Sequence, residues 1–356
     1  MGATHLHAII STGDEVTFDV NGMDGSCGKV YSVPHGDIAA VVSASPLADY
    51  RDLEREQAVH HLLNHQSVVE TVMRSFPLLP VKFGTTLPDI PDVRLLLEQG
   101  EGLFRTTLEK FAGLVQLEVV VLWNLSGVLQ EIGQEEPIVQ LKAQVATRGG
   151  EASVAERIAI GQMVQASLER RRAMLQDRLL PPLRGLALDS ATNPLMDDSM
   201  VANVALLVDE AGSKAMEERL EALDEEFGGR LHFRCVGPLP PYSFASVEVQ
   251  MLSFEAIDEA RRQLSLGETA SLDEIKGAYR RLAGQLHPDH DPDNPDAGAR
   301  MTALTQAYDL LTMYAGNLAS EGESAQQATC RFDQQTVEKT LLIAVRRQET
   351  LAESQH

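Results

Sequence analysis

The sequence predicts an α+β protein: two ferredoxin-like, βαβ-containing domains joined by long helices, then a small all-α helical hairpin. Three observations support this fold. The first 125 residues alternate strand and helix patterns, residues 201–237 repeat a strand–helix–strand order, and residues 272–311 hold two amphipathic stripes separated by a loop. We therefore expect domains at residues 1–125, 126–250 and 254–316, and a linker with a strand-like tail at residues 317–356.

The first domain begins with strand patterns that read THLHAII, VYSV and DIAAVVSA, with a glycine-rich turn near residues 22–28. Helix patterns follow over residues 52–76 and 91–112, and between them LLPVKFGTTL predicts a short strand and a turn. The apolar side of the first helix is expected to contain Val59, Leu62, Val69, Val72, Met73 and Phe76. A dense β-branched run, VQLEVVVLW at residues 115–123, predicts a buried strand. We expect the helices to cover one face of this sheet.

The second domain begins with helical residues 126–182, including a long helix over residues 152–180 that should end at Pro181-Pro182. Its segment LERRRAMLQDRLL, which contains Arg170–Arg172, is basic in an acidic chain. Two interpretations stay open: a solvated helix face, or a surface that holds an acidic partner or another subunit. A strand (VANVALLVD), an acidic helix and two more strands complete the domain.

The helical hairpin is predicted from two stripes at three- and four-residue steps. These stripes are Ile275, Tyr279, Leu282 and Leu286, then Met301, Leu304, Tyr308 and Leu311. Ser271 followed by Glu274 forms a capping box, so the first helix has a marked start. The stripes can bury each other only as an antiparallel pair, which places the His287-Pro288-Asp289 tripeptide at the tip of the hairpin.

A resemblance to the J domain of DnaJ-type co-chaperones covers residues 271–311, which read SLDEIKGAYRRLAGQLHPDHDPDNPDAGARMTALTQAYDLL. The tripeptide alone is a weak signal, but it lies between two correctly spaced stripes, with AYRRLA before it and QAYDLL after it. The resemblance implies a DnaK-type ATPase chaperone as partner, which docks on the tripeptide and on a basic helix face. The corresponding residues here are His287, Pro288, Asp289, Lys276, Arg280 and Arg281. Leu286 stands where J domains usually have an aromatic residue.

Two further segments resemble signatures of the gas vesicle protein L/F family, and the likeness covers roughly residues 4–250. The first signature comprises Leu79, Pro80, Phe83, Gly84 and Thr85; the second comprises Gly237, Pro238, Pro240, Pro241, Tyr242 and Phe244. Leu239 replaces the Trp that the family favours. Both segments have a structural character, because prolines fix φ and aromatic rings offer area for burial.

The family resemblance implies an accessory protein for building gas vesicles, which are gas-filled compartments with a shell of one small, very hydrophobic protein. Its implied partners are this shell protein and other gas vesicle accessory proteins. A chaperone that holds the shell subunit before assembly would limit aggregation. The alternative from another class is a minor structural component of the vesicle wall. An enzyme or small-molecule binder built on the ferredoxin-like domains is a third hypothesis.

Composition narrows the function classes. The net charge is −22, with the acids spread along the chain, which argues against nucleic acid and anionic membrane surfaces as partners. No apolar run approaches the roughly 18–20 residues of a membrane helix, and the N-terminus lacks the pattern of a signal peptide. Cys27, Cys235 and Cys330 are isolated, as in a reducing compartment. We expect a protein of the cytoplasm and the gas vesicle.

Other candidate sites are weak. His61 and His65 lie four residues apart on a predicted helix, but the Glu of a zinc-protease helix is missing and no third ligand is evident, so we expect ordinary histidines. DHDPDN, at residues 289–294, lacks the Gly and Glu of a calcium loop. GMDGSCGKV has the wrong spacing for a phosphate loop, and Trp123 is predicted to be core. Without a paired nucleophile and base we expect no enzymatic activity, no cofactor and no metal.

Overall fold

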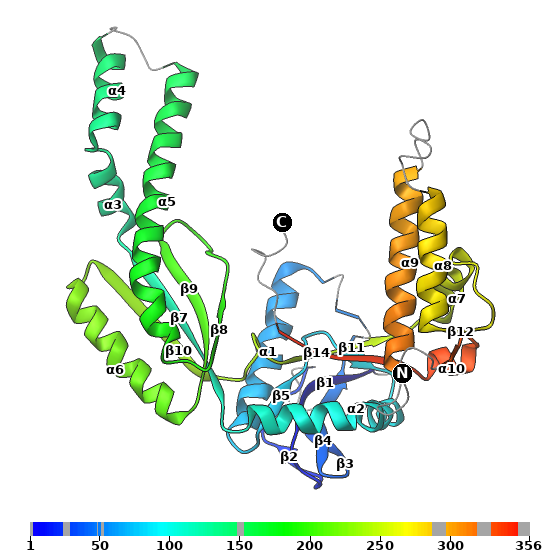
Figure 1. Cartoon of the computed structure of the whole chain (residues 1–356). Coiled ribbons are helices and arrows are strands. Elements are labelled where there is room, and N and C mark those ends of the chain that lie inside the picture. Colours follow the sequence, from blue (N-terminus) through cyan, green and yellow to red (C-terminus); the bar gives the residue numbers. More distant parts are fainter. Residues whose placement is uncertain are drawn as a thin grey trace.

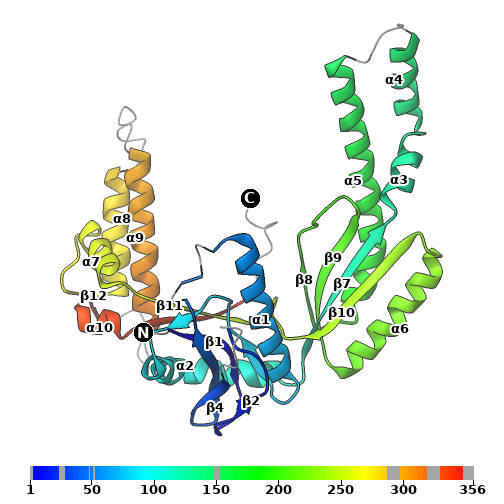
Figure 2. The same cartoon turned by 180° about the vertical axis from the view of Figure 1, so that it is seen from behind.

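The structure is a computed structural model that describes residues 3–23, 29–47, 49–50, 53–147, 153–286, 297–318 and 329–347. It confirms the α+β class. Two sheets with their helices form the base of the molecule, and two helical hairpins project from this base toward the same side (Figure 1), an arrangement that Figure 2 shows from behind. The predicted glycine-rich turn near residues 22–28 lies largely outside the described residues.

Six strands form the first sheet, in the order β2-β3-β4-β1-β5 with β6 beside β1. Their bounds are β1 Ala3–Ile10, β2 Thr17–Phe18, β3 Val30–His35, β4 Ile38–Ser45, β5 Leu78–Pro80 and β6 Thr86–Leu87. Neighbouring strands pair antiparallel, and β1 is central because it pairs with β4 on one side and with β5 and β6 on the other.

The first sheet is covered on both faces. Helix α1 (Arg55–Met73) packs Val68 and Val69 against the face of Ala8, and helix α2 (Ile90–Phe111) covers the opposite face. The expectation that helices cover one face is therefore wrong for this domain, because β1 and β4 carry apolar side chains on both faces and each needs cover. Val59 and Leu62, predicted on the buried side of α1, are exposed because only the C-terminal half of α1 reaches the sheet.

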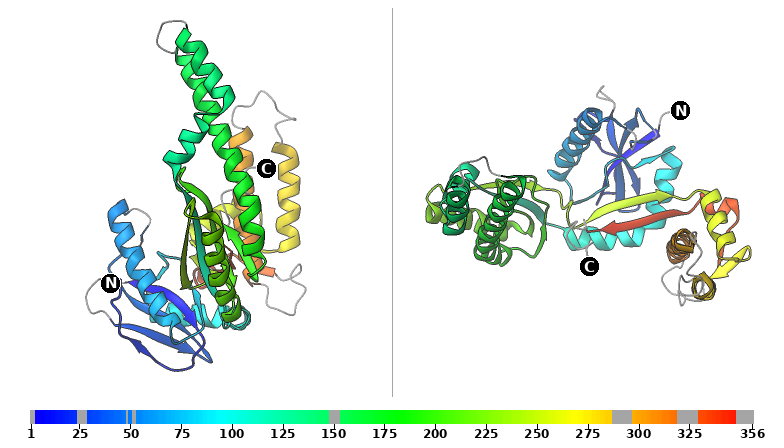
Figure 3. Two further views of the ribbon diagram at one scale, coloured as in Figure 1. Left: turned by 90° about the vertical axis from the view of Figure 1, so that its left-hand side faces the viewer. Right: turned by 90° about the horizontal axis from the view of Figure 1, so that it is seen from above.

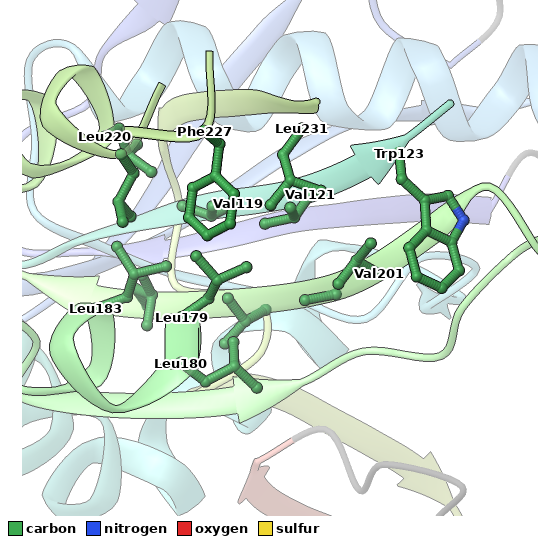
Figure 4. Close-up of a cluster of buried hydrophobic side chains, with 14 of the residues drawn as sticks. Val119, Val121, Trp123, Leu179, Leu180, Leu183, Val201, Leu220, Phe227 and Leu231 are labelled. Atoms are coloured by element: carbon green, nitrogen blue, oxygen red, sulfur yellow. The ribbon is translucent and has the colours of Figure 1, made fainter. Parts of the chain in front are cut away.

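The second sheet has ferredoxin-like topology. Strands β7 (Val115–Trp123), β8 (Asp189–Thr192), β9 (Met200–Val208) and β10 (Leu231–Leu239) lie in the order β10-β7-β9-β8. With helices α5 (Val154–Arg184) and α6 (Glu210–Phe227) on one face, the chain follows the βαββαβ order of that fold. The side chains between helices and sheet form one core, labelled in Figure 4.

The predicted boundary between the first two domains at residue 125 differs from the structure. Strand β7 was assigned to the first domain, but it pairs with β9 and β10 and so is a central strand of the second sheet. Its β-branched run predicted burial correctly, but nothing in the run itself states which strands it pairs with. Trp123 at its end is buried as predicted, and its Nε1 donates a hydrogen bond to the Asp198 carbonyl at 2.8 Å.

Helix α5 continues past its predicted end. Pro181 and Pro182 lie inside its last turns, and Leu183 beyond them is fully buried against the second sheet. A proline inside a helix costs about 3 kcal/mol, whereas burying one leucine contributes about 1.5–3 kcal/mol. Leu179 and Leu180 are buried in the same cluster, so packing of this turn outweighs the lost amide hydrogen bonds. With α3 (Leu125–Ile132) and α4 (Glu136–Thr147), α5 forms the long hairpin seen edge-on in Figure 3.

The helical module, residues 254–338, has a core of its own. It contains α7 (Phe254–Gln263), β12 (Thr269–Ser271), α8 (Leu272–Leu286), α9 (Ala297–Leu318), β13 (Thr329–Arg331) and α10 (Gln334–Glu338). Helices α8 and α9 form the module hairpin, and Ile275, Leu304 and Leu311 are buried between the helices as their spacing predicts. The predicted linker, residues 319–328, lies outside the described residues.

The helical module is inserted between two paired strands. Strand β11 (Ser246–Met251) precedes it, strand β14 (Leu341–Arg346) follows it, and the two pair antiparallel along their whole length. This ribbon packs on α2, where Val247 and Leu341 join the core of the first domain (Figure 3). The strand-like tail is thus confirmed as a strand from residue 341, and this strand is part of the first domain's core. Strands β11 and β14 hold the two ends of the module.

Candidate functional site

The sequence predicts a partner-binding site at the tip of the module hairpin. His287, Pro288 and Asp289 lie outside the described residues, as does the acid-rich stretch at residues 289–294. The structure shows the support for this tip: α8 ends at Leu286, directly before the tripeptide in the sequence. The predicted capping box at the other end of α8 is present, since Glu274 N donates to Ser271 Oγ at 3.2 Å and Ser271 N donates to Glu274 Oε2 at 2.7 Å.

The predicted basic face lies on the outer side of α8. Arg280 and Arg281 are exposed and Lys276 is half-buried, whereas Ile275 and Ala278 on the opposite side belong to the core. Within the described part of the chain, none of these three cations forms an ion pair with a carboxylate. Their charges are therefore available to an acidic surface on another protein.

The inner side of the module hairpin is rigidly packed. The rings of Tyr279 and Tyr308 stack with centroids 4.3 Å apart, one from each helix. Tyr314 is fully buried near the base, where its hydroxyl donates to the Arg331 carbonyl and burial raises its pKa to about 12. Asn317 Nδ2 donates to the Leu341 carbonyl, which connects α9 to the anchoring strand β14.

The first signature lies beside β11, the strand that follows the second signature in the sequence. Val81 forms a parallel bridge with Val247, and Lys82 N donates to the Val247 carbonyl at 2.9 Å. The Lys82 ammonium reaches Glu248 Oε1 at 2.7 Å. The first signature thus positions the start of β11, the strand that leads into the helical module.

The first signature builds a tight corner under α1. Leu79 is fully buried, and Pro80 pairs with Ala8 of β1. Gly84 has φ +86, a conformation that glycine adopts without steric cost, and Thr85 Oγ1 closes the turn by donating to the Lys82 carbonyl at 2.7 Å. The corner directs Phe83 toward the ring of His65, with centroids 5.7 Å apart.

The second signature joins the two α+β domains. Tyr242 packs on the core under α1, whereas Phe244 is buried against the second sheet, so the predicted burial of these rings is confirmed. A Cβ on Gly237 would lie 2.6 Å from Leu117 Cδ2, so only glycine fits this approach to β7. Ser243 N donates to Gln116 Oε1 at 2.8 Å, a further link to β7. Pro238, Pro240 and Pro241 complete the segment, and Pro240 and Pro241 are buried.

Two arginines of the basic α5 segment bond groups within their own chain. Arg171 bonds the Glu131 and Glu135 carboxylates at 2.6 and 2.9 Å. Arg172 lies over the Trp123 ring, and its Nε donates to the Met200 carbonyl at 3.0 Å. The hypothesis that these side chains hold an acidic partner is not favoured, since neighbouring helices and strands already use them.

The structure also groups histidines that the sequence did not bring together. His61 and His65 do not form the pair that their spacing suggested. Instead His65 Nδ1 lies 3.0 Å from Nε2 of His5, and His7 is the third member of this buried group. The only signal in the sequence was the alternation His-Leu-His on a strand, which places both histidines on one face.

Several exposed apolar side chains lie on the long hairpin. Val139 of α4 and Val154 and Ile158 of α5 leave 42%, 64% and 55% of their surfaces exposed. The N-terminus of α5 is stabilised by a capping box that Ser153 and Glu156 form. Among the helices of the described residues, none is both long and apolar enough to cross a membrane.

Comparison with known proteins assigns both parts of the chain. Residues 3–246 match the family described as "Gas vesicle synthesis protein GvpL/GvpF", and residues 262–315 match the DnaJ domain. "Gas vesicle protein F" of Dolichospermum flosaquae is 27% identical over 192 residues, which cover 53% of this chain and 78% of that protein. "Chaperone protein DnaJ 2" of Mycolicibacterium paratuberculosis is 49% identical over 51 residues, 14% of this chain and 13% of that protein.

Solved structures agree with the sequence comparison. The crystal structure of the gas vesicle protein GvpF from Anabaena sp. PCC7120 superposes with a TM-score of 0.55 at 25% identity, covering 68% of this chain and 98% of that one. The GvpF structure from Microcystis aeruginosa gives a TM-score of 0.52, also at 25% identity, with the same shares covered. The chain therefore belongs to the GvpL/GvpF family of gas vesicle proteins and carries, in addition, a DnaJ domain inserted before its last strand.

Proposed function

We propose that this protein is a gas vesicle assembly factor that binds the hydrophobic shell protein and recruits a DnaK-type chaperone to it. The observation that carries the proposal is the union in one chain of a GvpL/GvpF region and a DnaJ domain. The β11–β14 ribbon fixes that domain to the first domain's core, so the two regions have a defined relative position.

The helical module supplies the proposed chaperone contact. Its outer face presents Arg280 and Arg281 without carboxylate partners among the described residues, next to the end of α8 at which the tripeptide begins. Exposed cations of this kind steer association with an acidic surface, and this attraction weakens as salt is added. The buried inner face fixes the two antiparallel helices against each other, so the basic face of α8 has a fixed orientation.

The long hairpin is the surface we assign to the shell protein. Val139, Val154 and Ile158 expose apolar area far from the base, where no described element covers it. Exposed apolar patches on soluble proteins mark sites for apolar partners, and the shell protein implied by the family is such a partner. Both hairpins project to the same side of the molecule (Figure 1), so a client on the long hairpin would lie on the side toward which the module hairpin projects.

The remaining parts of the proposal follow from this role. We infer that the protein acts by binding other polypeptides and not by catalysis, and that it works in the cytoplasm and at the gas vesicle. The net charge of −22 supports the role, because like charges oppose self-association of a protein that handles an aggregation-prone client.

A pull-down of the full chain from a gas-vesicle-forming cell tests the proposal. We expect the shell protein and a DnaK-type chaperone to co-elute, and addition of ATP to change the amount of chaperone retained. Elution of neither protein would contradict the proposal. Purified vesicles washed with urea provide the second arm: retention of the chain on the washed vesicles would favour a structural component of the wall instead.

A further inference from the structure

Three buried histidines meet beneath α1. His5 and His7 come from β1 and His65 from α1, and each exposes at most 1% of its surface. One ring nitrogen from each lies within 4.8 Å of the other two. The ring centroids are 4.8 Å apart for His5 and His7, 5.2 Å for His5 and His65, and 5.3 Å for His7 and His65. Two segments about 60 residues apart in the sequence thus contribute to one compact imidazole group.

A β-bulge adjoins the group. Leu6 pairs with Val42 and Ala8 with Val41, which leaves His7 as the extra residue of β1. Strand alternation already places His5 and His7 on the α1 side of the sheet and Leu6 on the opposite side, and the bulge turns Ala8 to the side of the histidines. Bulges redirect side chains and are frequent beside functional sites.

The three rings are kept neutral with unused ring nitrogens. Burial, reinforced by the other histidines, lowers the pKa of His5 and His7 well below the usual value, and burial lowers the pKa of His65 to about 4. Three of the six ring nitrogens take part in two hydrogen bonds: His5 Nε2 with His65 Nδ1, and His7 Nε2 with Ser43 Oγ, both at 3.0 Å. Nδ1 of His5, Nδ1 of His7 and Nε2 of His65 have no hydrogen-bond partner in the described residues.

We propose that His5, His7 and His65 bind one divalent transition-metal ion, of which Zn²⁺ suits the ligand set best. Neutral imidazole is a preferred ligand of such ions, and three histidines with one open position form a known type of zinc centre. Buried polar atoms without partners are rare in native proteins, and because Ser43 holds His7 Nε2, the ion would give the unpartnered His7 Nδ1 a partner.

Two of the three ligand nitrogens already have the spacing that an ion needs, and the ligand atoms, now within 4.8 Å of one another, must draw closer to hold it. With Zn–N bonds of about 2.0–2.1 Å, ligand nitrogens in a tetrahedral site lie about 3.3 Å apart, and His5 Nε2 and His65 Nδ1 are already 3.0 Å apart. The proton now between these two atoms moves to the second nitrogen of the same ring, so the neutral rings bind the ion without net proton release. Ser43 already holds the His7 ring, as outer-shell groups commonly do for metal ligands.

A cavity beside His65 provides the open position and an entry path. Its volume is about 420 Å³, and His65, Phe83, Lys82, Tyr242 and Glu248 are among the residues that line it. A water molecule or a small anion entering here would complete the coordination of the ion. Residues of both signature segments line the cavity, so these segments would enclose the water or anion bound to the ion.

The ion would tie α1 to the first sheet. His65 is the first buried residue of α1, and the helix before it stays exposed on the side of Leu62 and Leu63. The metal would therefore act at the point where the helix reaches the sheet. This role is independent of chaperone recruitment, so the two proposals stand or fall separately.

Titration of the untagged full chain with Co²⁺ and Zn²⁺ tests the site. We expect one equivalent of Co²⁺ to give visible d–d absorption typical of four-coordination, displacement of that signal by Zn²⁺, and a higher melting temperature with Zn²⁺. X-ray absorption of the Zn²⁺ protein should show three imidazole nitrogens. A zinc shell with fewer than two imidazoles, or no saturable binding, overturns the proposal whether or not any variant folds.

Matched variants locate the ion. His7→Asn and His65→Asn should each weaken Zn²⁺ binding by more than about 100-fold, and Ser43→Ala by about 10–100-fold because it frees the His7 ring. His60→Gln, an exposed histidine on the same helix, should leave the affinity within about twofold. Equal weakening by His60→Gln, or unchanged affinity of a folded His65→Asn protein, would place the ion elsewhere and refute the site.

Discussion

The two hairpins that project from this molecule solve the same packing problem in different ways. In the module hairpin, Ile275, Leu304 and Leu311 bury one another, so the pair of helices has a complete core. In the long hairpin, Val154 and Ile158 remain exposed near the distal end. The module hairpin therefore buries most of its apolar stripe, although Met313 is 42% exposed, whereas the long hairpin leaves apolar area near its distal end.

The charged side chains show the reverse distribution. On α8, Arg280 and Arg281 are exposed without carboxylate partners among the described residues. On α5, Arg171 and Arg172 bond groups of their own domain. The comparison teaches that a basic helix pattern alone does not identify an interaction surface, because the tertiary neighbours decide whether the charges are free.

The largest expected effect is at the tip of the module hairpin. His287→Gln should reduce stimulation of a purified DnaK-type ATPase to near the unstimulated rate, a loss of at least tenfold, because the resemblance assigns docking to this tripeptide. His232→Gln, an exposed histidine on β10, is the matched control and should retain full stimulation. Unchanged stimulation by His287→Gln would remove the functional difference between the hairpins.

The second prediction concerns packing. Leu311→Ala should destabilise the helical module by about 2–5 kcal/mol, because the side chain is fully buried and its loss leaves a cavity. Ile158→Ala on the long hairpin should change stability by less than about 0.5 kcal/mol. Urea unfolding, followed with hydrogen exchange of α8 and α9, measures both. Similar losses for the two variants would show that the hairpins are packed alike.

The third prediction sharpens the assignment of the shell contact. Val154→Asp with Ile158→Asp should weaken shell-protein binding by about tenfold or more, since each apolar side chain buried in a complex contributes about 1.5–3 kcal/mol. Gln162→Asp, exposed on the same helix, controls for the added charge. ATPase stimulation should stay unchanged in both proteins, and a binding assay that shows no difference between them would exclude the long hairpin as the contact.

The smallest expected effect is that of single basic side chains on α8. Replacing Lys276, Arg280 or Arg281 by Ala should lower chaperone affinity by up to about fivefold each, because exposed ion pairs contribute about 0–1 kcal/mol. The loss should shrink as salt concentration rises. Arg170→Ala on the long hairpin is the control, and an equal loss there would indicate a general charge effect on the assay.

Local patterns predicted elements well when the contacts that stabilise them are local. The stripes on α8 and α9, the Ser271–Glu274 capping box and the order of β9, α6 and β10 are all confirmed. The predicted end of α5 is wrong because burial of Leu183 on a distant sheet outweighs the free-energy cost of two prolines in the helix. The assignment of β7 to the first domain is wrong for a similar reason, since strand partners 78 or more residues away decide its pairing.

The candidate sites divide along the same line. The basic residues of α8 follow from helical spacing and lie where expected, whereas the contact between Val81 and Val247 could not be read from either signature. The histidine group was missed because the approach of α1, which brings His65 to His5 and His7 on β1, is a contact between segments about 60 residues apart. The spacing of histidines within one helix suggested only a pair of His61 and His65.

By itself, the sequence determined that this chain is an α+β protein with an amphipathic helix pair around a His-Pro-Asp tip, because helix period and capping depend on residues only a few positions apart. Only the tertiary structure decided that the helical module is held between β11 and β14, that Arg171 and Arg172 of α5 are already bonded, and that three histidines share one buried space. Those outcomes depend on strand pairing and burial between distant segments, which no local spacing encodes.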